Sequence, residues 1–177
     1  MICNNMTSNR KTRTRTHQEP LGFQAHDHSL CVDQTLKAAE ARCAAEGLRL
    51  TPVRRKVLEL LLQEHRALGA YPILEMLREA GFGSQPPVAY RALDFLSEHG
   101  FVHKIERLNA FVACAHPDES HSPAFMICRA CDAVAETYTA PARGALGEAA
   151  RAAGFQIERT MVEAEGLCPD CAGKTDA

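Results

Sequence analysis

Residues 88–106 read VAYRALDFLSEHGFVHKIE, and this stretch joins an amphipathic helix to a strand. At 100° per residue, one face of residues 88–100 is apolar and the opposite face is polar. The apolar face carries Val88, Ala89, Ala92, Leu93, Phe95 and Leu96, and the polar face carries Tyr90, Arg91, Asp94, Ser97 and Glu98. Residues 101–106 and 111–114 then predict two strands around a turn near Leu108 and Asn109. The pattern therefore predicts a helix followed by a hairpin.

Three more helices are predicted upstream of this stretch. An Ala-rich helix over residues 34–46 is closed by Gly47, and Thr51 and Pro52 start a second one as N-cap and first helical residue. A third covers residues 70–80. Helices followed by a two-stranded hairpin are the order of a winged helix-turn-helix, which places its last helix in the DNA major groove. A small helical domain with a solvated polar face has the same order, so both interpretations remain open here.

Composition and charge indicate a globular chain with two parts. The 177 residues are 46% hydrophobic and 24% charged, which is typical of a soluble protein with one domain or two small ones. No apolar run approaches the ~20 residues of a membrane span, and no secretory signal follows the basic N-terminus, so we expect a cytoplasmic protein. Residues 34–107 carry 11 Lys/Arg against 9 Asp/Glu, whereas residues 108–177 carry 5 against 10. This asymmetry suggests two domains with different partners.

The C-terminal part has the pattern of a thin α/β layer. Strands are predicted at residues 124–127 and 133–135, a helix at 141–153, and a long alternating strand at 155–164. A layer of this size needs a covalent or metal staple, or a second subunit that continues its sheet.

Two cysteine pairs in this part are the strongest chemical signal. Each CxxC sequence places two thiolates close enough to share one metal ion, and two such pairs supply the four ligands of a closed tetrahedral zinc site. The pairs are Cys128 with Cys131 and Cys168 with Cys171. Eight cysteines without an export signal favour metal or redox chemistry over disulfides. Redox dithiols and simple buried thiols are the alternatives.

A second set of potential ligands is scattered along the chain. It comprises His103, Cys114, His121 and Glu136, whose nitrogen, sulfur and oxygen atoms could complete another zinc site. Spacing alone does not join them, since His103 alternates with Phe101 and Ile105 like a core residue. The cysteine could be a packed thiol and the glutamate a solvated carboxylate, and His116 competes with His121.

The chain resembles the ferric-uptake-regulator family of bacterial metal-responsive repressors, and within it the branch of zinc uptake regulators. The matching stretches include His121 and run in the family's order from about residue 34 to 172: LRLTPVR (48–54), PPVAYRALDFL (86–96), GFVHK (100–104), FMICRAC (125–131) and EAEGLCPDC (163–171). Iron and peroxide sensors of the family usually carry a His-His-Asp-His run before the first CxxC, where this chain has ESHSP (119–123). Sulfur among the sensing ligands also favours zinc over iron(II).

The resemblance implies an α+β fold in two domains. It implies an N-terminal winged helix-turn-helix DNA-binding domain at 34–109, with a hinge at its end. A C-terminal α/β dimerisation domain follows at 110–177. Residues 1–33, which are polar and lack periodicity, are predicted separately to be a disordered tail. About two zinc ions per chain are implied, a structural one on Cys128, Cys131, Cys168 and Cys171, and a sensing one on His103, Cys114, His121 and Glu136. The family's Thr-Val before the Tyr-Arg pair is Val88-Ala89 here, which would remove one hydroxyl contact to phosphate.

The expected function is zinc-responsive repression of zinc uptake genes, without catalysis. A homodimer would bind near-palindromic double-stranded operator DNA, with room for two dimers per operator. Zinc at the sensing site would join the wing and hinge to the dimerisation half. It would thereby hold the two DNA-binding domains of the dimer at the spacing of half-sites one helical turn apart. We expect a purine contact from Arg91, a thymine-methyl or phosphate contact from Tyr90, and phosphate contacts from Arg49 and Arg54.

Three alternatives to this function remain. The first is an iron or peroxide sensor of the same family. The second is a redox switch built on the CxxC pairs, whose oxidation would eject zinc. The third is a zinc hydrolase, which four protein ligands disfavour because they leave no open coordination position.

Overall fold

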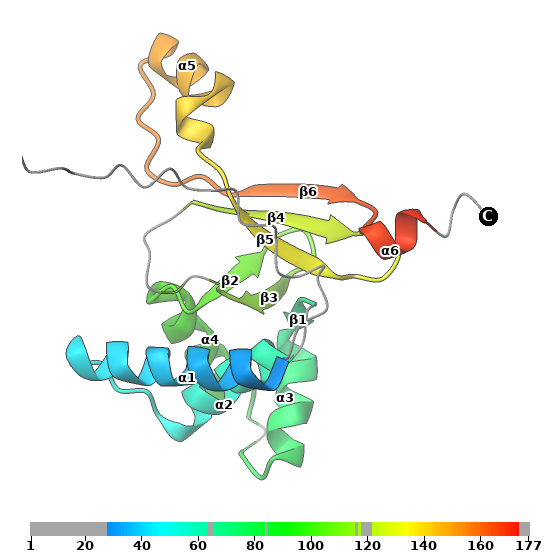
Figure 1. The fold of residues 1–177 in the computed structure, drawn as a ribbon. Coiled ribbons are helices and arrows are strands. Elements are labelled where there is room, and N and C mark those ends of the chain that lie inside the picture. Colours follow the sequence, from blue (N-terminus) through cyan, green and yellow to red (C-terminus); the bar gives the residue numbers. More distant parts are fainter. Residues whose placement is uncertain (1–27, 64–65, 84, 116, 118–121, 174–177) are drawn as a thin grey trace, which may run out of the picture.

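The computed structural model describes residues 28–63, 66–83, 85–115, 117 and 122–173. Figure 1 shows the N-terminal helices gathered at one end of the molecule, a sheet from the C-terminal part at the other, and a short hairpin between them. Among the described residues, no helix combines the length and the apolar character that crossing a membrane would require.

Four helices form the first lobe around the larger core. They are α1 (His28–Ala45), α2 (Pro52–Gln63), α3 (Ala70–Glu79) and α4 (Pro86–Glu98). Their buried faces meet through residues that include Leu58, Leu61, Ile73, Leu77, Leu93 and Leu96. The N–H of Arg54 donates to Thr51 Oγ1 at 3.4 Å, as expected of an N-cap. Helix α1 begins earlier than predicted, so residues 28–33 of the predicted tail are helical, and residues 1–27 lie outside the described part.

The hairpin predicted after α4 is present and forms a wing. Strands β2 (Val102–Ile105) and β3 (Ala110–Ala113) pair antiparallel, and β1 (Leu68–Gly69) adds to the other side of β3. The turn ends at Asn109, whose φ of 45° lies in the left-handed region that asparagine tolerates. The predicted domain division after residue 109 passes through this hairpin, because β3 pairs with β2.

A second sheet forms the C-terminal lobe. Its strands are β4 (Pro123–Cys128), β5 (Val134–Tyr138) and β6 (Val162–Gly166), and β4 lies in the centre, antiparallel to β5 and parallel to β6. The parallel pair requires a crossover, which contains the 3-10 helix η2 (Pro141–Arg143) and α5 (Ala145–Ala152). The short helix α6 (Pro169–Ala172) follows β6.

The prediction of a long strand at residues 155–164 was wrong. Strand β6 begins only at Val162, opposite Ala124, and residues 155–161 form no strand. Among the described residues, the parallel ladder begins one residue after Pro123, the first residue of β4, because a proline cannot donate to a ladder. The alternation of apolar and polar residues therefore predicted a strand that begins too early.

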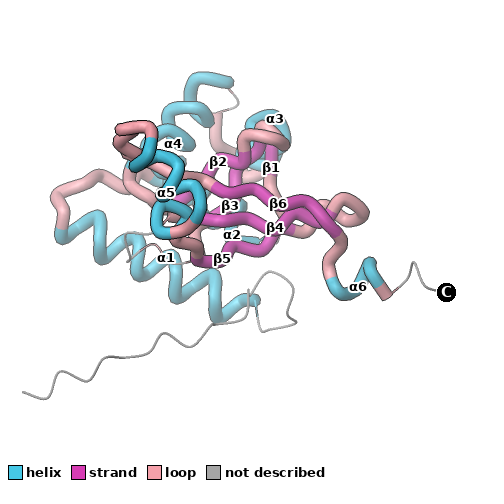
Figure 2. The backbone as a smooth tube through the Cα atoms, turned by 90° about the horizontal axis from the view of Figure 1, so that it is seen from above, coloured by secondary structure: helices cyan, strands magenta, loops and turns pink. Residues whose placement is uncertain are grey.

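The two lobes share a second, smaller apolar core. Ile105 and Val112 of the hairpin pack with Phe125 and Ile127 of β4 and with Val134 of β5. The wing thus contacts the helical lobe on one side and the C-terminal sheet on the other. Seen from above in Figure 2, β2 and β3 of the wing lie in the same region of the view as β4 and β6 of the C-terminal sheet.

Candidate metal centres and nucleic-acid interface

Sheet register brings the two CxxC pairs together. Cys128 is the last residue of β4, opposite Gly166 of β6, and Cys168 follows two residues later as the N-cap of α6. The N–H of Arg129 donates to the Gly166 carbonyl at 2.9 Å, which fixes the two strand ends side by side. Cys131 lies in the turn after β4 and Cys171 in the single turn of α6, so each pair faces the other.

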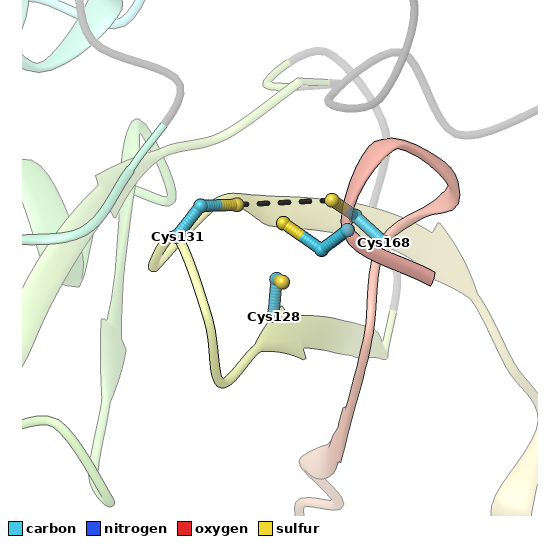
Figure 3. A group of neighbouring side chains, drawn as sticks. Cys128, Cys131 and Cys168 are labelled. Atoms are coloured by element: carbon cyan, nitrogen blue, oxygen red, sulfur yellow. Dashed lines mark hydrogen bonds between the residues drawn. The ribbon is translucent and has the colours of Figure 1, made fainter. Parts of the chain in front are cut away.

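The four sulfur atoms have the geometry of a metal site. They all lie within 4.8 Å of one another, and the Cys131 and Cys168 sulfurs are 3.7 Å apart. Figure 3 shows the side chains of Cys128, Cys131 and Cys168 turned toward one space. Sulfurs ~2.3 Å from one zinc ion at tetrahedral angles lie roughly 3.8 Å apart, so the spacing fits zinc and is far too long for a disulfide.

The thiols of this cluster differ in acidity. Hydrogen bonding from the backbone of Cys168, and then of Ala130 and Cys131, lowers the pKa of Cys128 from 9.0 to about 6 despite its burial. Hydrogen bonding with Cys168 and Cys131, together with burial, raises the pKa of Cys171 to about 12. Cys128 therefore loses its proton more readily than Cys171. A divalent cation would favour the thiolate form of all four, as zinc binding requires.

Three of the four predicted sensing residues converge where the lobes meet. His103 is on β2, Cys114 follows β3, and Glu136 is on β5, and their ligand atoms lie within 4.8 Å of one another. His103 Nε2 is 3.5 Å and Cys114 Sγ 3.9 Å from Glu136 Oε1. His121 and its competitor His116 lie outside the described residues.

The environment of these three side chains suits a cation. The Glu136 side chain is 5% exposed, and its other oxygen accepts a hydrogen bond from the N–H of Ala115 at 2.9 Å. Cys114 is buried, and the His103 ring packs 5.6 Å from the Phe125 ring. A buried carboxylate beside a thiol and an imidazole is costly without positive charge, and this nitrogen, sulfur and oxygen set is one that zinc accepts.

Helix α4 presents the predicted base-reading residues to solvent. Arg91 is exposed, and Tyr90 is 43% exposed, while Ala89, Ala92 and Leu93 are buried against the helical core. Arg49, just before α2, is also exposed. Their exposure leaves these side chains available to a ligand such as DNA.

Arg54, the second predicted phosphate contact, makes contacts within the protein. It is partly buried, and its guanidinium carbon lies 3.6 Å above the centre of the Phe95 ring of α4. Its Nη1 donates to the Arg49 carbonyl at 2.6 Å. The guanidinium therefore joins the start of α2 to α4 within the protein.

The sequence did not single out Tyr71. It lies in the first turn of α3, and 74% of it is exposed, the largest fraction among the exposed large hydrophobic residues. A bulky aromatic beside the buried Ala70, just before the apolar stripe of a helix, was the only sign available.

Comparisons with known proteins identify the family of this chain. Residues 45–165 match the model of the ferric uptake regulator family. The zinc uptake regulation proteins of Escherichia coli (strain K12) and Shigella flexneri are each 42% identical over 141 residues, covering 79% of this chain and 82% of the relative. A zinc uptake regulator solved with zinc and DNA has a TM-score of 0.78 at 39% identity, over 82% of this chain and 98% of that one. The crystal structure of holo XcZur has a TM-score of 0.71 at 42% identity, over 83% and 99%.

Proposed function

Because the chain belongs to the ferric uptake regulator family, we propose that it is a zinc-responsive DNA-binding repressor that acts as a homodimer on zinc uptake genes. The observation that carries this proposal is the junction of His103, Cys114 and Glu136. These residues bring zinc-type donors from both lobes to one place between a winged helix and a sheet. The winged helix that would bind DNA is thereby joined directly to the metal site.

The four-cysteine cluster would hold the structural zinc. Cys128 and Cys131 come from the β4 end, and Cys168 and Cys171 come from α6, so the bound ion supplies a cross-link between segments that only strand pairing otherwise joins. The small C-terminal sheet gains folding free energy from such a link.

His103, Cys114 and Glu136, together with His121, would hold the regulatory zinc. When bound, it supplies a link between wing, hinge and sheet. Glu136 already receives the Ala115 N–H, so this carboxylate orients the chain just after the wing. When zinc restricts the rotation of one lobe against the other, the protein spends a larger fraction of time in the arrangement that binds DNA. Its apparent affinity for DNA rises in proportion to that fraction.

Helix α4 would enter the major groove, with Arg91 reading a purine, Tyr90 touching a thymine methyl or phosphate, and Arg49 neutralising phosphate. The contacts of Arg54 support a different role from the predicted phosphate contact. We infer that it positions the Arg49 backbone against α4. Tyr71 joins the candidate DNA contacts because of its exposure.

The dimer would form through the C-terminal lobe. Helix α5 projects from the sheet on the side away from the helical lobe (Figure 1), and Leu146 and Phe155 are 51% and 67% exposed. Two such faces could cover each other and bring two readers to a near-palindromic operator in the cytoplasm. We place the division between DNA-binding and dimerisation parts after Cys114, so that the hairpin stays whole.

A combined metal and DNA-binding assay tests the proposal. Zinc content should fall from two ions per chain to one after mild chelation, and operator binding measured by fluorescence anisotropy should fall with it and return with added zinc. Loss of both ions together, or equal operator binding before and after chelation, would refute the two-site scheme. Mild oxidant and iron(II) serve as parallel arms, and restoration of binding by iron(II) but not by zinc would favour an iron sensor of the same family.

A further inference from the structure

The turn at the tip of the wing is held by a strand of the other lobe. Backbone N–H groups at a hairpin turn lie beyond the ladder and need other acceptors. The N–H of Glu106 donates to Glu163 Oε1 at 2.8 Å, and the N–H of Arg107 donates to Glu163 Oε2 at 3.2 Å. One carboxylate of β6 thus receives two successive donors of the β2–β3 turn.

A neighbouring carboxylate holds the side chain of the same turn. The Arg107 guanidinium forms an ion pair with Glu165. Glu163 and Glu165 are two residues apart in β6, so their side chains leave the same face of the strand. The Arg107 ion pair is exposed and joins two long side chains, so it contributes little. The two bonds to Glu163 are also exposed, but they are charge-assisted and hold the backbone of the turn directly. Glu163 is therefore the main polar contact.

Apolar packing seats the turn beneath these carboxylates. Ile105, just before the turn, is fully buried with Phe125 and Ile127 of β4. Leu108, within the turn, packs on the same cluster, as does Met161 just before β6. Apolar packing already holds the turn against the C-terminal sheet. The carboxylate of Glu163 therefore fixes the orientation of the turn on that sheet.

The contact is connected along the chain to both candidate metal centres, through β6 to Cys168 and through β2 to His103. Strand β6 runs from Glu163 to Gly166, beside Cys128, and on to Cys168. Strand β2 carries His103 three residues before Glu106. A shift of the turn relative to β6 would therefore move His103 relative to Glu136, although Glu163 belongs to neither donor cluster.

We propose that Glu163 is a positioning residue for the zinc response, because it holds the wing turn on the zinc-stapled sheet and so preorganises His103 and Cys114 toward Glu136. The inference rests on the proposed function. Removing the carboxylate should leave the four-cysteine cluster and the DNA-reading helix intact, and should instead raise the zinc concentration that DNA binding requires. A preorganised site loses less conformational freedom when it binds zinc. Loss of the Glu163 contact would therefore weaken zinc binding and, through it, DNA binding.

The first measurement detects the contact without DNA or the regulatory metal. Backbone amide exchange of Glu106 and Arg107 is followed by NMR in full-length dimer that retains one zinc per chain. In Glu163→Ala both amides should lose protection, whereas Glu163→Gln, which keeps one acceptor oxygen, should retain part of it. The control Glu158→Ala removes an exposed carboxylate nearby and should leave both amides unchanged. Unchanged exchange in Glu163→Ala would refute the contact.

The second measurement concerns regulation. Operator binding is titrated with zinc, and Glu163→Ala should shift the half-maximal zinc concentration upward by about fivefold or more, with Glu163→Gln shifted less and Glu158→Ala not at all. At saturating zinc, Glu163→Ala should regain wild-type affinity. A curve that superimposes on wild type would refute the proposal, and so would a weakening at saturating zinc equal to that at low zinc. A wild-type protein that ignores zinc would refute the proposed function, whereas the exchange result would stand on its own. If Glu163→Ala fails to fold, Glu163→Gln decides by the same criteria.

Discussion

The Arg54 side chain makes its contacts within the protein, although its positive charge suggests a contact with nucleic acid. Its stacking on Phe95 needs a flat guanidinium, and its bond to the Arg49 carbonyl needs a directed N–H. We expect Arg54→Lys to weaken operator binding as much as Arg54→Ala, since lysine keeps the charge but not the planar group. Anisotropy titrations check this, with Arg49→Lys as the control, because a lysine there still neutralises phosphate. Wild-type affinity in Arg54→Lys would restore the predicted phosphate role.

The acidity of Cys128 affects how zinc binding depends on pH. Its lowered pKa, about 6, means that this sulfur carries no proton to displace at pH 7, whereas Cys171, whose pKa is raised to about 12, must release one. We expect fewer than four protons released per structural zinc at pH 7, and about one more when the pH falls below 6. Calorimetry in buffers of different ionisation enthalpy measures this number. Four protons released at both pH values would contradict it.

Among the elements, the junction of α4 and β2 depends on one glycine. Gly100 has φ of +71°, and the N–H of Phe101 donates to the Leu96 carbonyl at 2.8 Å, which ends the helix and starts the wing. A Cβ at Gly100 would meet no atom within 4 Å, so the cost of Gly100→Ala is conformational, roughly 1–2 kcal/mol of unfolding free energy. Urea denaturation checks this. Gly83→Ala, also in open space and without a positive φ, should cost less.

The elements also show what the sequence could predict. Thr51 and Pro52 marked the start of α2 because capping is local, and the periodicity of residues 88–98 marked α4. Strand β1 has two residues, too few for alternation to appear, and the start of β6 depends on where β4 begins. The four cysteines were recognisable from their spacing. The grouping of His103 with Glu136 came from family resemblance, and the contacts of Arg54 and Glu163 required coordinates.

At the scale of the whole molecule, the shared core limits how far the lobes can part. Ile105 and Val112 remain packed on the C-terminal sheet only while the lobes are closed. We expect chelation of the regulatory zinc to increase the radius of gyration of the dimer in small-angle scattering, because the His103, Cys114 and Glu136 group loses its link. Restoring zinc should reverse the change. The variant Glu136→Gln should stay expanded at zinc concentrations that close the wild type, and an unchanged radius on chelation would contradict this expectation.

The hairpin that belongs to both cores has a consequence for protein engineering. A hybrid regulator made by fusing this metal-sensing half to a foreign DNA reader cannot be spliced at residue 109, since the cut would separate β2 from β3. Splicing after Cys114 would keep the ladder, yet a foreign wing would also need counterparts of Ile105 and Val112 to fill the interface. Interchange of halves between relatives should therefore succeed only where the wing's inward-facing residues are exchanged together with the sheet that receives them.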